Sequence, residues 1–209
     1  MAIFDEVKKK LVQVHGFSNY NDVKCEKKSI VLHHTAGGSA DSSVAFWKTR
    51  NDKVSTCVVI DRDGTILQCF HSDRWAFSLG INQANYIDIE KQTIAIEIAS
   101  YGRCVKSRGD WYNAYAGYMA PEKVCQLEKP FRGEIAYEKY TTQQIESVRL
   151  LLLLWKERYG IDIKYHDDIF DINQRALKGQ GGLYTHCCFR SDKSDIFPQP
   201  EMVEMLKSL

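Results

Sequence analysis

"SIVLHHTAGG", at residues 29–38, is the stretch from which the fold prediction starts. Its short run of apolar and β-branched residues predicts a buried strand, and the glycine pair predicts where that strand ends. The strand closes with two adjacent histidines, although the whole chain contains only six. Neighbouring residues of a strand point to opposite faces, so only one of His33 and His34 can face a site on a given side of the sheet.

Strand and helix signals alternate along the chain on either side of this stretch. Capping residues followed by apolar ones predict a helix at 39–50. A hairpin is predicted at 56–70, where an Asp-Gly pair joins two apolar segments in a tight turn. The strand predicted at 93–100 alternates, with three isoleucines on one face and Glu97 among small residues on the other. This alternation of elements predicts an α/β fold.

Further helices are predicted near both ends of the chain. Apolar residues at helical spacing predict a helix at 4–14, and a capping box opens a longer helix at 141–159, which Gly160 ends. A short helix is expected after Pro200. The segment at 101–139 is rich in glycine, tyrosine and tryptophan, which predicts a long loop over the substrate.

Composition is that of an ordinary soluble globular protein, with 44% hydrophobic and 26% charged residues. The length of 209 residues predicts a single domain over 1–209, with residues 1–27 as an extension packed on it. A net charge of +1 provides no field that would attract nucleic acid, so we expect no nucleic-acid partner.

Export and membrane signals are missing from the sequence. The first residues mix acids with bases and lack the apolar core of a signal peptide. The longest apolar run, at 150–155, is too short to cross a bilayer. Seven cysteines, an odd number without the spacing of a disulfide framework, indicate reduced thiols. We therefore expect a protein made in the cytoplasm, without a membrane partner.

Polar residues that local structure does not require occur in three segments: the paired histidines, Glu97, and "THCCFRSDKSD" at 185–195. Zinc is held by nitrogen, sulfur and carboxylate oxygen, and a catalytic zinc site uses three protein ligands. A histidine at the end of the strand, His186 and Asp195 would supply such a trio for one zinc ion. Glu97, on a neighbouring strand, would be the general base.

Other interpretations of these residues stay open. Cys187 and Cys188 adjoin a candidate ligand, but neighbours on an extended chain point away from it, which favours buried thiols. His166 is the second-choice ligand. Glu97 is alternatively a structural carboxylate paired with an arginine, and Lys193 a surface lysine. Four aromatic residues of the long excursion either pack within it or stack on sugars: Trp111, Tyr112, Tyr115 and Tyr118.

Four motifs, in order along the chain, resemble the zinc-dependent N-acetylmuramoyl-L-alanine amidases of the type-2 amidase and peptidoglycan-recognition-protein superfamily. "IVLHHTAGG" resembles the first strand of the family and implies His33 as a zinc ligand. "VVIDRDGTI" resembles its hairpin, and "IAIEI" resembles the strand with its catalytic glutamate, here Glu97. His186 followed by "KSD" resembles its last motif, which implies His186 and Asp195 as ligands and Lys193 as the catalytic lysine.

This resemblance covers about residues 28–207 and implies a central mixed sheet flanked by helices. Three positions depart from the family pattern. Thr56 stands where some phage amidases have a catalytic tyrosine, and Ser78 stands where related sequences often have histidine. The "DPGP" that usually follows the third ligand is "DIFPQP" here. The residues that we predict to contact substrate are His34, Thr35 and Ser78.

The activity that the resemblance implies is hydrolysis of the amide between N-acetylmuramic acid and L-alanine in peptidoglycan. A chain without a separate wall-binding domain resembles an endolysin of a phage or prophage, which would act as a monomer on the cell wall after release by a holin-type partner. Two alternatives remain. Superfamily members that lack a complete zinc trio bind peptidoglycan fragments without cutting them, and a cytoplasmic amidase would recycle muropeptides. The complete set of residues favours an enzyme.

Overall fold

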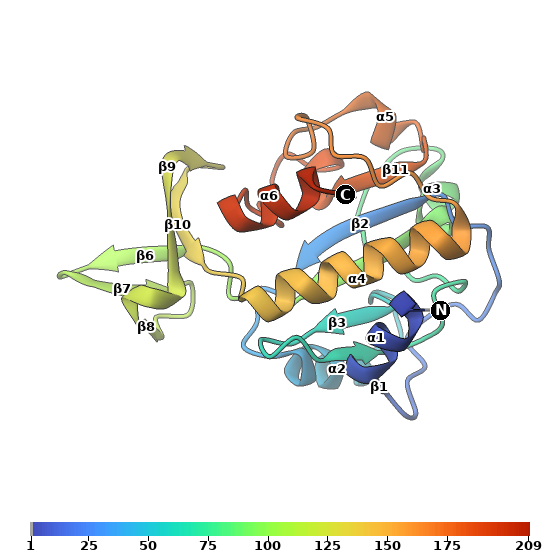
Figure 1. Cartoon of the computed structure of the whole chain (residues 1–209), viewed down its shortest axis with the longest axis horizontal. Coiled ribbons are helices and arrows are strands. Elements are labelled where there is room, and N and C mark those ends of the chain that lie inside the picture. The colour runs from blue at the N-terminus through green and yellow to red at the C-terminus, as the bar shows by residue number, and fades with distance from the viewer. Residues whose placement is uncertain (1) are drawn as a thin grey trace.

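A six-stranded mixed sheet forms the centre of the computed structural model, which describes residues 2–209 (Figure 1). Strands β3 and β4 pair antiparallel, whereas the other neighbours in this sheet are parallel. The predicted α/β fold with a central mixed sheet is confirmed. In spatial order the strands are β1 (Leu11–Gln13), β4 (Ile66–Gln68), β3 (Val58–Ile60), β5 (Thr93–Ile98), β2 (Ser29–His34) and β11 (Gly182–Thr185).

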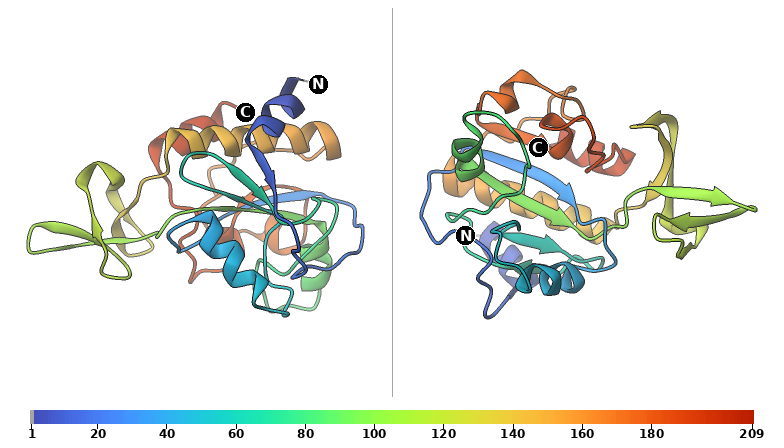
Figure 2. Two further views of the ribbon diagram at one scale, coloured as in Figure 1. Left: turned by 90° about the horizontal axis from the view of Figure 1, so that it is seen from below. Right: turned by 180° about the vertical axis from the view of Figure 1, so that it is seen from behind.

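Helices cover both faces of the sheet. Figure 2 shows α4 and α1 on one side of the sheet and α2 on the other. Among residues 2–209, no helix combines the length and the hydropathy needed to cross a bilayer. The helices are α1 (Ala2–Lys10), α2 (Ala40–Lys48), α3 (Tyr86–Gln92), α4 (Thr142–Tyr159), α5 (Gln174–Leu177) and α6 (Pro200–Lys207).

Strand β2 lies between β5 and β11, where the sheet is parallel. The residues from Ser29 to His33 are buried and His34 is half-buried, as expected for a parallel strand covered on both faces. The carboxyl ends of β2, β5 and β11 therefore meet at one edge of the sheet. In open α/β sheets this edge is where ligands bind.

Helix α4 begins and ends where the sequence predicts. The Thr141 hydroxyl accepts a hydrogen bond from the Gln144 backbone N–H at 3.1 Å, and Gln144 Oε1 accepts one from the Thr141 N–H at 3.0 Å. Gly160 ends the helix in the left-handed region, with φ +68°. Gln144 also donates to the carbonyl of Ala99 at 2.8 Å, which fastens the start of α4 to the end of β5.

The helix predicted at 4–14 is wrong at its C-terminal end. Helix α1 stops at Lys10, and the next three residues form β1, which pairs in parallel with β4 at the edge of the sheet. Val7 is buried as the periodicity requires, but Phe4 is 54% exposed. Pairing with β4 satisfies the backbone of β1, so tertiary structure overrides the helical periodicity here.

The β3–β4 hairpin needs glycine at its turn. Gly64 has φ +84°, and a Cβ there would lie 2.7 Å from the Gln143 carbonyl oxygen. We expect Gly64→Ala to lower the free energy of unfolding by about 2–4 kcal/mol, because left-handed strain adds to overpacking. Gly16→Ala is the matched control, since Gly16 has φ +68° with no atom within 4 Å of its Cβ position. Strain alone should cost the control about 1–2 kcal/mol, and equal losses in urea unfolding would contradict the packing argument.

The excursion at 101–139 is a folded insertion, not the predicted loop. Figure 1 shows it projecting beyond the ends of β2 and β3. Trp111 packs in a small second core, whereas Tyr115 and Tyr118 are 66% and 62% exposed. The insertion consists of a three-stranded sheet, a short 3-10 helix and a hairpin: β6 (Cys104–Ser107), β7 (Asp110–Asn113), β8 (Tyr118–Met119), η1 (Pro121–Lys123), β9 (Val124–Phe131) and β10 (Glu134–Glu138).

An ion pair fastens this insertion to the central sheet. Arg62, in the hairpin turn, donates from Nε to Oε1 of Glu138 at 3.0 Å and from Nη2 to Oε2 at 2.8 Å. Glu138 Oε2 also accepts the Tyr101 N–H at 2.5 Å, and the Arg62 guanidinium lies over the Tyr101 ring and donates to the carbonyl of Gly38. Both connections of the insertion are thereby held against the loop that follows β2.

Candidate active site

The register of β2 and β5 places His33 directly beside Glu97. Paired residues of adjacent strands point to the same face of the sheet, so these two side chains share one side of it. His33 is 2% exposed and Glu97 is half-buried. His34 is turned to the opposite face, where its Nδ1 lies 3.0 Å from the Tyr140 hydroxyl.

A third element brings His186 and Asp195 to the same place. Strand β11 pairs with β2 and leads into a 3-10 helix, η2 (His186–Cys188). His186 Nδ1 lies 3.0 Å from His33 Nδ1 and 2.9 Å from Asp195 Oδ2. The third side of this triangle, from His33 Nδ1 to Asp195 Oδ2, measures 3.3 Å. All three residues are buried, and their ligand atoms form a cluster that could hold a metal ion.

The donors fit a tetrahedral metal of the zinc class. Bonds of about 2.0–2.1 Å to nitrogen or oxygen put the ligand atoms of a tetrahedral site roughly 3.3 Å apart, close to the spacing of this triangle. Burial, together with the neighbouring His186, lowers the pKa of His33 to about 4, so His33 is neutral, as a metal ligand must be. Burial raises the pKa of Asp195, but the neighbouring His186 and His33 rings outweigh that effect and hold the pKa well below its usual range.

The second ring nitrogen of His186 has a partner that sets its tautomer. His186 Nε2 lies 2.9 Å from the carbonyl oxygen of Leu79, which can only accept a hydrogen bond. The proton of a neutral His186 is therefore on Nε2, and the Nδ1 lone pair faces the other two ligand atoms. A histidine that ligates metal commonly donates its other ring N–H to a carbonyl in this way.

Glu97 carries a carboxyl oxygen that the fold does not satisfy. Its Oε2 is buried and has no hydrogen-bond partner within residues 2–209. The loss of solvent raises its pKa well above the ordinary value, and the nearby Asp195 carboxylate adds to the effect, whereas Lys193 lowers it. The alternative of a structural carboxylate paired with an arginine finds no support, because no ion pair of Glu97 occurs in this described range. Carboxyls with raised pKa values in clefts are candidates for acid–base catalysis.

Lys193 lies in the turn between His186 and Asp195. Its side chain is half-buried, and its charge lowers the pKa values of both Glu97 and His33, so it lies near the cluster. Its role toward substrate, against that of a plain surface lysine, stays a prediction.

Two of the predicted substrate contacts are engaged within the fold. The Thr35 hydroxyl accepts hydrogen bonds from the N–H groups of Gly37 at 3.1 Å and Ser100 at 3.2 Å, which joins the loops after β2 and β5. Ser78 is bonded to the carboxylate of Glu90 through both its N–H and its hydroxyl, at 3.0 and 3.2 Å. Their roles toward substrate stay predictions, as does that of His34.

The alternative ligands lie outside the cluster. Cys187 Sγ contacts the carbonyl oxygen of Lys193 at 3.3 Å, and Cys188 Sγ that of Ile169 at 3.0 Å. Burial raises the pKa of Cys187 to about 12 and that of Cys188 to about 11, so both stay protonated thiols. His166 is not part of the metal-ligand cluster in the described structure.

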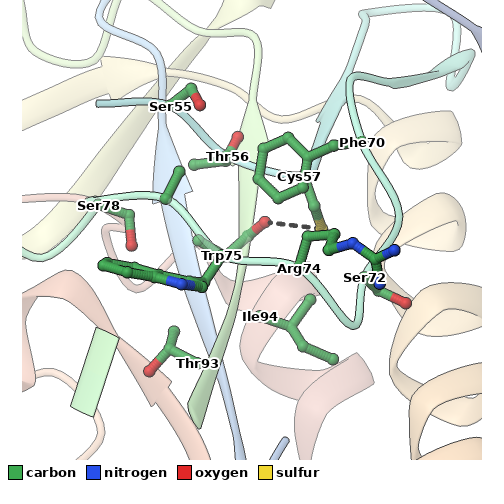
Figure 3. A pocket seen from close by; sticks show the side chains of 12 residues that line it. Ser55, Thr56, Cys57, Phe70, Ser72, Arg74, Trp75, Ser78, Thr93 and Ile94 are labelled. Carbon is green, nitrogen blue, oxygen red and sulfur yellow. Dashed lines mark hydrogen bonds between the residues drawn. The ribbon is translucent and has the colours of Figure 1, made fainter. Parts of the chain in front are cut away.

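A cavity that is lined in part by Ser78 is too small to be a substrate site (Figure 3). Its volume of about 10 Å³ leaves room for one water at most. Figure 3 shows Thr56, Trp75 and Ser78 around it, with Cys57 bonded to the carbonyl of Ala95 at 3.6 Å. The hydroxyl of Thr56 bonds to the carbonyl of Val58 at 3.0 Å and so takes the role of a structural residue.

Several residues that shape the site were not predicted from the sequence. The Leu79 carbonyl is a backbone group and carries no sequence signal. Glu90, Tyr140 and the Arg62–Glu138 pair act through contacts between distant segments. Of these residues only Arg62 had a sequence signal, because an arginine in the tight turn of "DRDGT" can reach a carboxylate on a neighbouring element.

Similarity to known proteins agrees with this geometry. A comparison with curated protein sequences gives no match. The solved structure of PlyL is similar over 95% of this chain and 96% of its own, with TM-score 0.53 and 14% identity. A mutant endolysin from Bacillus subtilis covers the same shares, with TM-score 0.54 and 12% identity. The PlyG catalytic domain has TM-score 0.54 and 14% identity over 94% of this chain and 90% of its own. At these identities the likeness shows a common fold.

The family assignment rests on the sequence itself. The profile of the N-acetylmuramoyl-L-alanine amidase family matches residues 24–195. This match spans most of the chain and includes His33, Glu97, His186 and Asp195. The chain therefore belongs to the N-acetylmuramoyl-L-alanine amidase family, within the type-2 amidase superfamily.

Proposed function

We propose that the protein is a zinc-dependent amidase that hydrolyses the bond between N-acetylmuramic acid and L-alanine in peptidoglycan. The observation that carries the proposal is the buried triangle of His33, His186 and Asp195, with sides of 2.9–3.3 Å, beside an unpartnered carboxyl oxygen of Glu97. Two neutral imidazoles and one carboxylate are a donor set for catalytic zinc. When bound, zinc would acidify water toward pKa about 7 and polarise the scissile carbonyl.

Glu97 is the general base and acid in this proposal. Glu97 pairs with His33 in the register of β2 and β5, which supports a position of its side chain next to that ligand. Its Oε2 has no competing hydrogen bond in the described chain. The carboxylate would accept a proton from the attacking water and return it to the departing amine of L-alanine. Its raised pKa favours both steps near neutral pH, because a base that is too weak holds no proton to return.

Lys193 stabilises the oxyanion that develops on the scissile carbonyl. Its ammonium is close enough to lower the pKa of Glu97, and a fixed positive charge on a half-buried side chain stabilises developing negative charge. We assign His34, Thr35 and Ser78 to the rim of the substrate site, where they would contact the muramoyl group or the stem peptide either directly or through the loops that they hold.

Replacing Lys193 with methionine keeps the length of the side chain and removes its charge. We expect turnover to fall about 10²–10³-fold, as for loss of one oxyanion donor, with zinc content unchanged. Lys178→Met, at an exposed lysine, is the matched control and should retain full turnover. Near-normal turnover in Lys193→Met, measured as release of amino termini from peptidoglycan, would remove Lys193 from the mechanism.

The biological role that we propose is lysis of the bacterial cell wall by a monomeric, endolysin-like enzyme of a phage or prophage. The likeness to a protein described as an endolysin supports it. The protein would be made in the cytoplasm and would reach the wall with the help of a holin-type partner. A muropeptide-recycling amidase would use the same residues, so activity on intact sacculi must be compared with activity on soluble muropeptides. Lysis requires activity on sacculi, whereas activity confined to soluble fragments would favour recycling.

A recognition module without catalysis is the remaining alternative. The complete His33, His186 and Asp195 set, with Glu97 beside it, argues against this alternative because a module that only binds needs no general base. The test is release of L-alanine amino termini from purified peptidoglycan, with and without a zinc chelator. Release that the chelator abolishes, and that added zinc restores, supports the proposed function. Binding without release would support the recognition module.

A further inference from the structure

Glu90 is a buried carboxylate that the proposed mechanism does not use. It lies near the end of α3 and is 2% exposed. Its Oε2 accepts hydrogen bonds from the Ser78 N–H at 3.0 Å and the Ser78 hydroxyl at 3.2 Å, and its Oε1 accepts the Leu79 N–H at 3.0 Å. One carboxylate thus fixes two consecutive residues of a segment that has no helix or strand of its own.

That segment carries the carbonyl that orients a metal ligand. The Leu79 oxygen lies 2.9 Å from His186 Nε2, and Leu79 is fully buried. The Leu79 N–H is itself bonded to Glu90 Oε1, so the carboxylate holds the residue whose carbonyl faces His186. Burial raises the pKa of Glu90, and the N–H groups of Leu79 and Ser78 oppose that rise by bonding to its charged form.

We propose that Glu90 is a positioning residue for His186, acting through Leu79, whose N–H it accepts and whose carbonyl faces His186 Nε2. A metal-ligating histidine is often held by a carboxylate on its other nitrogen, which fixes the ring and raises its basicity as a ligand. Here the carboxylate acts one residue further away. Its hydrogen bonds to the Ser78 and Leu79 N–H groups fix the position of Leu79, and so fix the carbonyl that accepts from His186 Nε2.

Ser78 has a part in the same arrangement. Related sequences often have histidine at this position, whereas here the serine hydroxyl provides an additional donor to Glu90. The departure at residue 78 is thereby tied to the support of the metal site. This inference rests on the proposed zinc site but not on the bond that the enzyme cleaves.

The test compares Glu90→Gln with wild type in a zinc-competition titration against a chromogenic chelator. We expect zinc affinity to fall about 10–100-fold, the usual effect of losing an outer partner of a ligand histidine. Glu90→Asp, which restores the charge, should recover part of that loss. Glu122→Gln, at an exposed glutamate in η1, is the matched control and should bind zinc like wild type.

A second readout separates positioning from a general effect on the fold. In zinc-free wild type, nitrogen-15 NMR should find the His186 proton on Nε2, with slow exchange, and exchange should be faster in Glu90→Gln. A folded Glu90→Gln variant with wild-type zinc affinity and unchanged exchange would overturn the inference. If that variant does not fold, a wild-type His186 whose Nε2 carries no proton would overturn it instead. Failure of wild type to bind zinc would contradict the proposed function, so the two failures are distinguishable.

Discussion

Glu97→Gln is expected to keep the fold and the zinc content of the protein while lowering turnover about 10²–10⁴-fold, the usual contribution of general acid–base catalysis. Glutamine has nearly the same shape as glutamate but cannot accept the proton. Because Glu97 Oε2 has no hydrogen-bond partner in the described structure, removing its charge breaks no hydrogen bond of that oxygen and should not destabilise the fold. Turnover is measured as release of L-alanine amino termini from peptidoglycan.

The pH profile of the wild type provides an internal check on this prediction. Loss of solvent raises the pKa of Glu97, so its carboxylate form, which is the active base, is lost as pH falls through a value above the usual range for glutamate. Activity should therefore decrease on the acidic side, and Glu97→Gln should lack this acidic limb. Glu122→Gln is the control for removing a glutamate charge elsewhere. Turnover within about threefold of wild type in Glu97→Gln would exclude Glu97 as the base.

His186→Ala is expected to have the second large effect, abolishing both stoichiometric zinc and detectable turnover. The imidazole of His186 forms two sides of the ligand triangle, to His33 and Asp195, and two remaining ligands do not make a catalytic zinc site. Metal content is measured after dialysis, with wild type expected to hold about one zinc per chain.

A matched histidine tests whether the loss is specific to the cluster. His166→Ala removes the second-choice ligand, which lies outside the cluster, and should retain one zinc and full turnover. Far-UV circular dichroism of both variants separates loss of metal from loss of fold. Stoichiometric zinc in a folded His186→Ala variant would place the metal elsewhere in the chain.

Elements with strong local signals were predictable from the sequence. Strand β2 ends in a glycine pair, the β3–β4 hairpin contains Asp-Gly, and α4 has a capping box at one end and glycine at the other. Each signal acts within a few residues, so tertiary structure has little to overrule. The helix predicted at 4–14 had only periodicity to support it. Its last predicted turn instead contains strand β1, which pairs with β4.

The insertion and the supports of the site needed contacts that no local pattern encodes. Strands β6, β7 and β8 of the insertion are only two to four residues long, so their alternation is too weak to detect. The cluster of His33, His186 and Asp195 followed from family motifs, since spacing alone left His34 and the cysteines open. The contacts of the Leu79 carbonyl and of Glu90 arise only because the fold brings the segment at 78–80 against His186 and α3.

Mass analysis of peptidoglycan digested by the purified protein tests the central claim most directly, because it identifies the bond that is cleaved. The proposed site predicts intact stem peptides with free L-alanine amino termini and glycan strands whose muramic acid carries a free lactyl carboxylate. These products should disappear when zinc is removed and in Glu97→Gln. Disaccharide peptides with new reducing ends, or shortened stem peptides, would show cleavage of another bond and contradict the amidase assignment.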